Sequence, residues 1–332
     1  MPKGLSNVER LVATLNGTKA DRVPNFEILI DNRATRHILN LPTAGDRITL
    51  WTLPPDQAVE LVRRIGQDAI ACSMTWNLDE RWGHIQSHAD ADSLAPPDPG
   101  EARAKLADYL QAVADTPVGM VARVSGPMTL AYMALGPVPI ESFMMMLYDQ
   151  PDLVERVMDI FLDYHLKVIE AIADLPFDLF YIGDDISSST GPMISPKDLE
   201  RFWAPRTERL IRAALATGRP IIFHCCGQLA PILPYLARWG VQAVHPIQPV
   251  ANDIYAIRAE YPRLTLVGNI DVDSVLSRGK PEQVRADVRE HIDRLAGDGR
   301  YVVCSSHSII DSVVPENFLA MVSETHEYGV YA

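Results

Sequence analysis

The tripeptide His224-Cys225-Cys226 brings side chains that can bind a metal together within three positions. It follows an apolar run, RPIIF, that is typical of a buried strand. Because successive strand residues point to opposite faces, His224 and Cys226 share one face and Cys225 points to the other. A nitrogen and a sulfur presented together can bind zinc, and a catalytic zinc site has a third protein ligand and one open position. The alternative interpretation is a core histidine beside two small buried thiols.

The third ligand is expected from the segment CSSH at 304–307, which follows another apolar run. Cys304 and His307 compete for this position, and both belong to the end of the same predicted strand, with Cys304 earlier in the chain. Cys72 lies in the middle of an apolar run, and we expect it to be a packed core thiol.

Two adjacent acids, Asp184 and Asp185, follow the apolar run FDLFYIG. They could hold a metal, accept a proton or orient a substrate. Paired acids after a strand can also begin a solvated loop, and the sequence alone favours neither interpretation.

Eight short apolar or β-branched runs alternate with longer amphipathic segments. Strands that alternate with helices predict a parallel sheet, and eight of them close a (β/α)8 TIM barrel, an α/β fold. Active sites of such barrels lie at the C-terminal ends of the strands, which is where polar residues collect here. A doubly wound open sheet is the alternative, but no Gly-rich dinucleotide fingerprint follows the first strand. The predicted strands are 23–30, 68–74, 117–125, 177–183, 219–224, 241–247, 263–269 and 300–304.

We expect a single domain over residues 1–332, with N-terminal and loop elaborations of the barrel. The stretch 75–115 is irregular at its start and predicts a loop over the barrel mouth followed by a helix. The region 138–174 predicts two helices with a break near residues 149–152, where a proline occurs.

The composition limits the binding partners and the cellular compartment that we expect. The chain carries 30 basic and 43 acidic residues, for a net charge of −13, and no basic run that would bind nucleic acid. No apolar stretch is long enough to span a bilayer, and the N-terminus lacks the apolar core of a secretory signal. Four cysteines are too few for a disulfide scaffold. We therefore expect a cytoplasmic protein with no nucleic-acid or membrane partner.

Several segments taken together resemble the uroporphyrinogen decarboxylase superfamily, which includes zinc- and corrinoid-linked methyltransferases. The resemblance spans nearly the whole chain and implies the barrel fold. The matching segments are DRVP at 21–24, SGPMTLAYMALG at 125–136, IGDDISSSTGPMISPKDLERFWAP at 182–205, FHCCG at 223–227, VGNID at 267–271 and SSHSIIDSVVPENFLAM at 305–321.

The decarboxylase branch matches less well. Decarboxylases resemble one another in an Arg-Gln-Ala-Gly-Arg segment after the first strand, whose arginines hold the carboxylates of the substrate. Here that region reads FEILIDNRATRHIL, so Arg33 and Arg36 are present but the motif is not. Met74 stands where a decarboxylase has an aspartate for the pyrrole nitrogens, although Tyr132 and His307 match its tyrosine and histidine. Because a porphyrinogen needs charge-assisted partners for its carboxylates, decarboxylation is the less favoured activity.

The methyltransferase branch binds zinc through a His-x-Cys pair on strand five and a cysteine near the end of strand eight. His224 and Cys226 match the pair, and His307 falls at the third position, with Cys304 as the alternative ligand. The resemblance implies a zinc-dependent methyltransferase, or demethylase. It would move a methyl group between a small O-, N- or S-methyl compound and a corrinoid protein or tetrahydrofolate. A corrinoid would arrive on a partner protein, because the chain has no obvious room for a cobalamin domain.

The other strand ends provide the remaining candidate residues. The expected catalytic residues are Asp184, Asp185 and Tyr132. The residues expected to bind substrate are Glu27, Ser125, His245, Asn269 and Asp271. Two alternatives remain open: a metal-free decarboxylase of porphyrinogen-like or smaller acids, and a non-catalytic barrel that binds a tetrapyrrole or corrinoid. The decarboxylase relatives suggest a homodimer.

Overall fold

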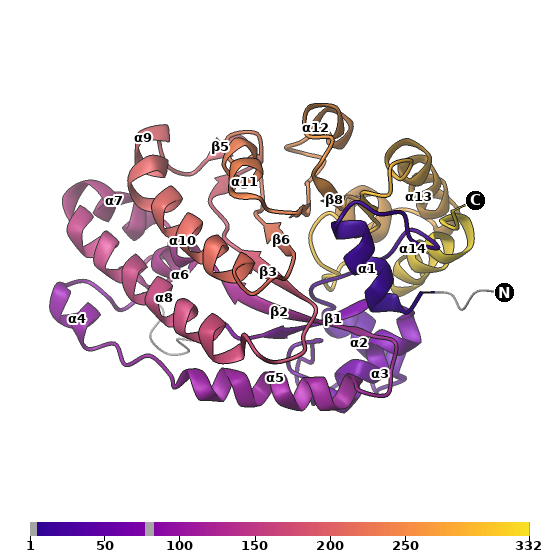
Figure 1. The fold of residues 1–332 in the computed structure, drawn as a ribbon, viewed down its shortest axis with the longest axis horizontal. Coiled ribbons are helices and arrows are strands. Elements are labelled where there is room, and N and C mark those ends of the chain that lie inside the picture. Colours follow the sequence, from indigo (N-terminus) through magenta and orange to yellow (C-terminus); the bar gives the residue numbers. More distant parts are fainter. Residues whose placement is uncertain (1–4, 77–82, 332) are drawn as a thin grey trace.

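A parallel sheet of seven strands curls around the centre of the molecule, and helices cover its outside (Figure 1). This arrangement comes from a computed structural model that describes residues 5–76 and 83–331. Neighbouring strands pair in parallel in the order β1-β2-β3-β6-β7-β8-β9. These strands are β1 (Ala69–Ser73), β2 (Gly119–Ser125), β3 (Leu179–Gly183), β6 (Ile221–His224), β7 (Ala243–His245), β8 (Thr265–Val267) and β9 (Tyr301–Val302).

The prediction of a regular first strand at 23–30 is wrong. This segment makes only isolated parallel bridges, Asn25 to Val303 and Ile30 to Ile309. On its other side, the backbone N–H of Asp68 donates to the carbonyl of Asn25 at 3.1 Å. Pro24 has no N–H to donate, which limits the ladder that the segment can form. The segment nevertheless lies between β9 and β1, so it completes the predicted (β/α)8 ring as an irregular eighth member.

Helices follow the strands in alternation, and prolines in the first turn open many of them, where a missing N–H costs nothing. A two-residue hairpin, β4 (Ser187–Ser188) with β5 (Gly191–Pro192), follows β3. The helices are α1 (Asn7–Leu15), α2 (Asn32–Leu39), α3 (Pro55–Ile65), α4 (His88–Asp92), α5 (Pro99–Val113), α6 (Pro127–Ala134), α7 (Glu141–Asp149), α8 (Pro151–Ile172), α9 (Pro196–Asp198), the π-helix η2 (Leu199–Trp203), α10 (Ala204–Leu215), α11 (Leu233–Trp239), α12 (Ile254–Glu260), the π-helix η3 (Val272–Ser277), α13 (Pro281–Leu295) and α14 (Pro315–Tyr328).

Two predicted helical regions are found where the sequence placed them. The region 138–174 contains α7 and α8, separated at Gln150 just before Pro151. The stretch 75–115 contains α4 and then the longer α5, while its residues 77–82 lie outside the described part of the chain. No helix within residues 5–76 and 83–331 is long and apolar enough to cross a membrane.

Buried apolar residues form two separate clusters, one on each side of the sheet. The inner cluster fills the barrel and contains alternate strand residues such as Val121, Tyr181 and Ile222. The outer cluster lies between the sheet and the helices and contains their neighbours along each strand. Cys72 and Cys225 belong to the outer cluster. Strand alternation therefore decides which side chains face the inside of the barrel.

A buried ion cluster ties the bottom of the barrel together. Asp68, just before β1, is fully buried and accepts from Arg10 at 2.5 Å and from Arg22 at 3.0 Å. It also accepts the backbone N–H of Asn25 at 2.7 Å. One carboxylate thus joins α1, the irregular first segment and β1.

Candidate active site

Asp185, His224 and Cys226 form the group within the described residues whose ligand atoms lie together as a metal ion requires, all within 4.8 Å of one another. His224 Nε2 lies 3.3 Å from Asp185 Oδ1 and 3.5 Å from Cys226 Sγ. The backbone N–H of Cys226 donates to Asp185 at 2.8 Å. His224 is the last residue of β6, and Asp185 and Cys226 lie two residues beyond the ends of β3 and β6. The two strands pair with Gly183 opposite His224. The predicted common face of His224 and Cys226 is the one that Asp185 also shares.

The electrostatics of this group favour a cation. Burial alone would raise the pKa of Asp185, but His224 and the backbone N–H of Cys226 outweigh it and hold that pKa well below its ordinary value. Burial and the charge of Asp185 raise the pKa of the Cys226 thiol, so it keeps its proton without a compensating charge. A zinc ion supplies that charge, and nitrogen, thiolate and carboxylate are its ordinary ligands. The residues present therefore fit zinc.

A contact at Nδ1, the nitrogen opposite the candidate metal site, fixes the orientation of the His224 ring. Its Nδ1 lies 2.7 Å from Nδ1 of His245, which also contacts the Tyr181 hydroxyl at 3.0 Å. His245 is completely buried, and burial holds its pKa well below the ordinary value, so it is neutral. These contacts leave Nε2 of His224 facing Asp185 and Cys226. A partner on the far nitrogen is the usual way to orient a metal-binding histidine.

The two residues predicted to compete as third ligand lie in different places. His307 lines the same cavity as His224 and Asp185, and its Nδ1 is buried with no partner in the described part of the chain. Cys304 is fully buried in the inner cluster and lies beside the carboxyl of Glu27. Within residues 5–76 and 83–331, neither residue belongs to the group whose ligand atoms lie within 4.8 Å of one another. Of the two, only His307 reaches the cavity.

Asp184, although adjacent to Asp185, points away from the cavity. Its carboxyl is fully buried and accepts from the N–H and hydroxyl of Thr129, at 2.8 and 2.9 Å, and from Trp203 Nε1 at 3.1 Å. Burial raises its pKa to about 7. Tyr132, on α6, is 9% exposed, and burial and the nearby Asp185 raise the pKa of its hydroxyl.

Two residues predicted to bind substrate hold the barrel wall together. Glu27 is fully buried and accepts the N–H and hydroxyl of Ser305 at 2.6 and 2.7 Å. Burial raises its pKa to about 7. The hydroxyl of Ser125 lies 2.9 Å from that of Thr75. The polar atoms of both side chains therefore form hydrogen bonds with residues near the ends of neighbouring strands.

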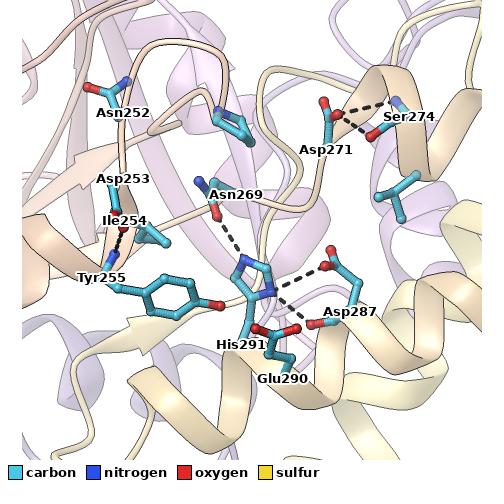
Figure 2. Close-up of a pocket in the computed structure, with 12 residues that line it drawn as sticks. Asn252, Asp253, Ile254, Tyr255, Asn269, Asp271, Ser274, Asp287, Glu290 and His291 are labelled. Atoms are coloured by element: carbon cyan, nitrogen blue, oxygen red, sulfur yellow. Dashed lines mark hydrogen bonds and ion pairs between the residues drawn. The ribbon is translucent and has the colours of Figure 1, made fainter.

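Asn269 and Asp271 line a different pocket, between α12, η3 and α13 (Figure 2). Asn269 Oδ1 lies 2.9 Å from His291 Nε2, and Asp271 caps η3 by accepting from Ser274. This pocket shares no lining residue with the cavity at His224. The sequence places both residues at the end of a strand, but their side chains point outward, toward the helices that surround the barrel.

The central cavity has a volume of about 180 Å³ and includes residues to which the sequence assigned no role. Two of these residues, Arg123 and Tyr181, could have been identified from the sequence. Side chains alternate between the two faces of a strand, and this alternation places both inside the barrel. The lining residues are Ile28, Leu29, Trp51, Arg123, Thr129, Tyr181, Gly183, Asp185, His224, His307 and Ser308.

Comparison with known proteins identifies the barrel. Residues 81–328 match the family model described as uroporphyrinogen decarboxylase (URO-D). The chain belongs to the URO-D family. A uroporphyrinogen decarboxylase from Myxococcus xanthus is 27% identical over 83% of this chain and 84% of that protein. The methylcobamide:CoM methyltransferase MtbA of Methanosarcina mazei is 25% identical, over 54% of this chain and 50% of that protein.

Solved structures confirm the fold of this URO-D family member. A methyltransferase from Methanosarcina mazei superimposes with a TM-score of 0.76 at 20% identity, covering 98% of this chain and 99% of that one. The predicted superfamily and barrel are thus confirmed. Relatives within the URO-D family include both decarboxylases and methyltransferases, so the site itself has to distinguish the two activities.

Proposed function

We propose that this protein is a zinc-dependent methyltransferase that acts on a small O-, N- or S-methyl compound. The observation that carries the proposal is the convergence of Asp185, His224 and Cys226 within 4.8 Å at the strand ends. A site that contains a buried thiol, an imidazole and a carboxylate is arranged for a metal, whereas the decarboxylase hypothesis requires no metal. The methyltransferase relatives are consistent with this activity.

The residues of the chain would take distinct roles. His224 and Cys226 hold the zinc, and the third ligand is either Asp185, which lies closest, or His307, which the resemblance predicts. Zinc bound there supplies a Lewis acid that polarises the reacting heteroatom. His245 keeps the ring of His224 in place, and Tyr132, on α6, lies near Asp185. The residue among Asp185 and His307 that is not a ligand is placed to accept or return a proton.

The dimensions of the cavity also favour a small substrate. Pockets for drug-sized ligands have volumes of about 300–1,000 Å³, and the cavity here measures about 180 Å³. A cavity of this volume favours a small substrate over a tetrapyrrole. The methyl group would pass to or from a corrinoid protein or tetrahydrofolate that approaches the open C-terminal face of the barrel. Free methylcobalamin and methyltetrahydrofolate are the probes for these two partners.

Zinc titration of the purified protein tests the site. We expect one tightly bound zinc in the wild type, loss of tight binding in Cys226→Ala, and unchanged binding in Cys225→Ala. The Cys225 variant is the matched control, because that thiol is adjacent in sequence but packs in the outer cluster. Comparing Asp185→Asn with His307→Ala identifies the third ligand by the larger loss of affinity. Full, tight occupancy in Cys226→Ala would refute the proposed site.

Decarboxylation of a small acid is the second candidate, and the match to the Myxococcus xanthus decarboxylase over 83% of the chain favours it. Such an enzyme would need no metal. It predicts that complete removal of zinc leaves turnover unchanged. The methyltransferase hypothesis predicts that turnover is lost on chelation and returns with added zinc.

A further inference from the structure

Arg123 is a charged residue in the central cavity for which the proposed function has no role. It lies on β2, opposite Tyr181 of β3, and its side chain points into the barrel. Asp185 and His224 line the same cavity of about 180 Å³. A substrate bound in this small space would therefore contact the guanidinium and the candidate metal site together.

Arg123 forms no ion pair within the described residues, and the nearby carboxylate of Asp185 acts on its charge only from a longer distance. None of the ion pairs in residues 5–76 and 83–331 includes it. Its Nη1 donates to the hydroxyls of Ser73 and Thr75, at 2.9 and 2.8 Å. A guanidinium carries five N–H donors, so most of them remain for another acceptor. Burial lowers the pKa of Arg123, as expected for a cation that lacks a full counter-charge.

The guanidinium is held in a fixed position. The ring of Trp51 stacks on it, 4.5 Å from the guanidinium carbon to the ring centroid. Trp51 is itself anchored, because its Nε1 donates to the carbonyl of Ile28 at 3.0 Å. On the other side, Thr75 is hydrogen-bonded to Ser125 at 2.9 Å. Two strand ends and an aromatic ring thus orient the free donors before any ligand arrives, which lowers the entropy cost of binding.

We infer that Arg123 binds a carboxylate of the substrate, so that the transferred methyl group belongs to a small methylated carboxylic acid. The inference rests on the proposed function and specifies its substrate class. A planar guanidinium and a carboxylate can form two parallel N–H···O bonds. The cavity also contains the carboxylate of Asp185, so a monoanion is better accommodated than a phosphate dianion. With the acid group on Arg123, the rest of a short substrate extends toward His224.

Calorimetric titration of the full-length, metal-free protein tests the inference. The protein is freed of metal with a chelator, and the chelator is then removed by gel filtration. The probes are methoxyacetate and its neutral isostere methoxyacetamide, with inorganic phosphate as a third. We expect the wild type to bind methoxyacetate about 10- to 100-fold more tightly than the amide, as charge-assisted hydrogen bonds require.

Variants locate the effect at the arginine. Arg123→Met is expected to bind the acid and the amide equally weakly, and Arg123→Lys to keep part of the preference. Arg103→Met is the matched control, because that arginine pairs with Asp174 on the outside of the barrel. It should preserve the full preference.

Equal binding of acid and amide by the wild type overturns the inference without depending on any variant. Tighter binding of phosphate than of methoxyacetate overturns the choice of a carboxylate. Because the titrations contain no metal, they are independent of the zinc test. A wild-type protein that binds no zinc refutes the proposed function, and a wild-type protein that does not prefer the acid to the amide refutes the role of Arg123.

Discussion

Glu27 allows a quantitative test of the barrel interior. It is fully buried, and its carboxyl accepts the N–H and hydroxyl of Ser305, at 2.6 and 2.7 Å, and lies beside the Cys304 thiol. Burial raises its pKa from 4.5 to about 7. The folded protein therefore holds a proton on Glu27 over a pH range in which the unfolded chain has lost it.

The sign of the effect follows from this difference. A raised pKa contributes stability that is fully present below pH 4.5 and is lost as pH rises to about 7. Since each pKa unit corresponds to about 1.4 kcal/mol, the total contribution is about 3 kcal/mol, of which about 2 kcal/mol is lost between pH 5.5 and 8. Glu27→Gln removes the titrating group and keeps a neutral side chain of the same shape. Its amide oxygen can still accept from Ser305.

Urea unfolding of metal-free wild type and Glu27→Gln, from pH 5.5 to 8, provides the measurement. The free energy of unfolding of the variant minus that of the wild type should rise by about 2 kcal/mol over this range, because other titrating groups cancel. Glu60→Gln is the control, since hydrogen bonding to Arg64 lowers the pKa of that exposed acid. Its difference should not rise with pH. A Glu27→Gln difference that stays constant would refute the account of a buried, protonated Glu27.

Three further predictions concern positions around the barrel. Asp68→Asn removes the carboxylate that pairs with Arg22 and leaves Arg10 with Asp21 alone, so urea unfolding should show a loss of about 3–5 kcal/mol, with zinc affinity unchanged. Gly227→Ala forces a β-carbon to within 2.3 Å of a backbone carbonyl at a φ of +78°, so thermal unfolding should report a loss of at least about 1–3 kcal/mol, together with weaker zinc binding. Trp203→Phe removes the 3.1 Å hydrogen bond to Asp184, and the same assay should show a loss of about 1–3 kcal/mol while zinc titration stays normal. A stability equal to that of the wild type in any of the three variants would contradict its prediction.

The sequence predicted the architecture well because strand alternation and proline positions are local signals. Seven of the eight predicted strands are present, and the helix break before Pro151 is where the proline requires it. The exception is the segment 23–30. Its apolar composition resembles a strand, but its pairing depends on β9 and β1, which are distant in the sequence, and Pro24 removes one donor.

The site was predicted less completely, because strand ends do not specify side-chain direction. Asp184 and Asp185 are adjacent, yet one packs against Trp203 and the other faces His224. Asn269 also follows a strand, but it turns to the outer ring. The importance of Arg123 could not be recognised from its own residue type. It depends on the absence of a direct ion pair in the described structure, which is a three-dimensional property.

The irregular segment 23–30 also has a consequence for dynamics. It closes the ring through isolated bridges at Asn25 and Ile30, where the other neighbours share continuous ladders. Local opening costs least where backbone hydrogen bonds are few, so amide hydrogens along this seam should exchange faster than those of β2 or β3. Ile28 and Leu29, in the middle of the seam, line the cavity. A ligand that fills the cavity contacts both sides of the seam, so occupancy and closure of the barrel are thermodynamically linked, and each favours the other.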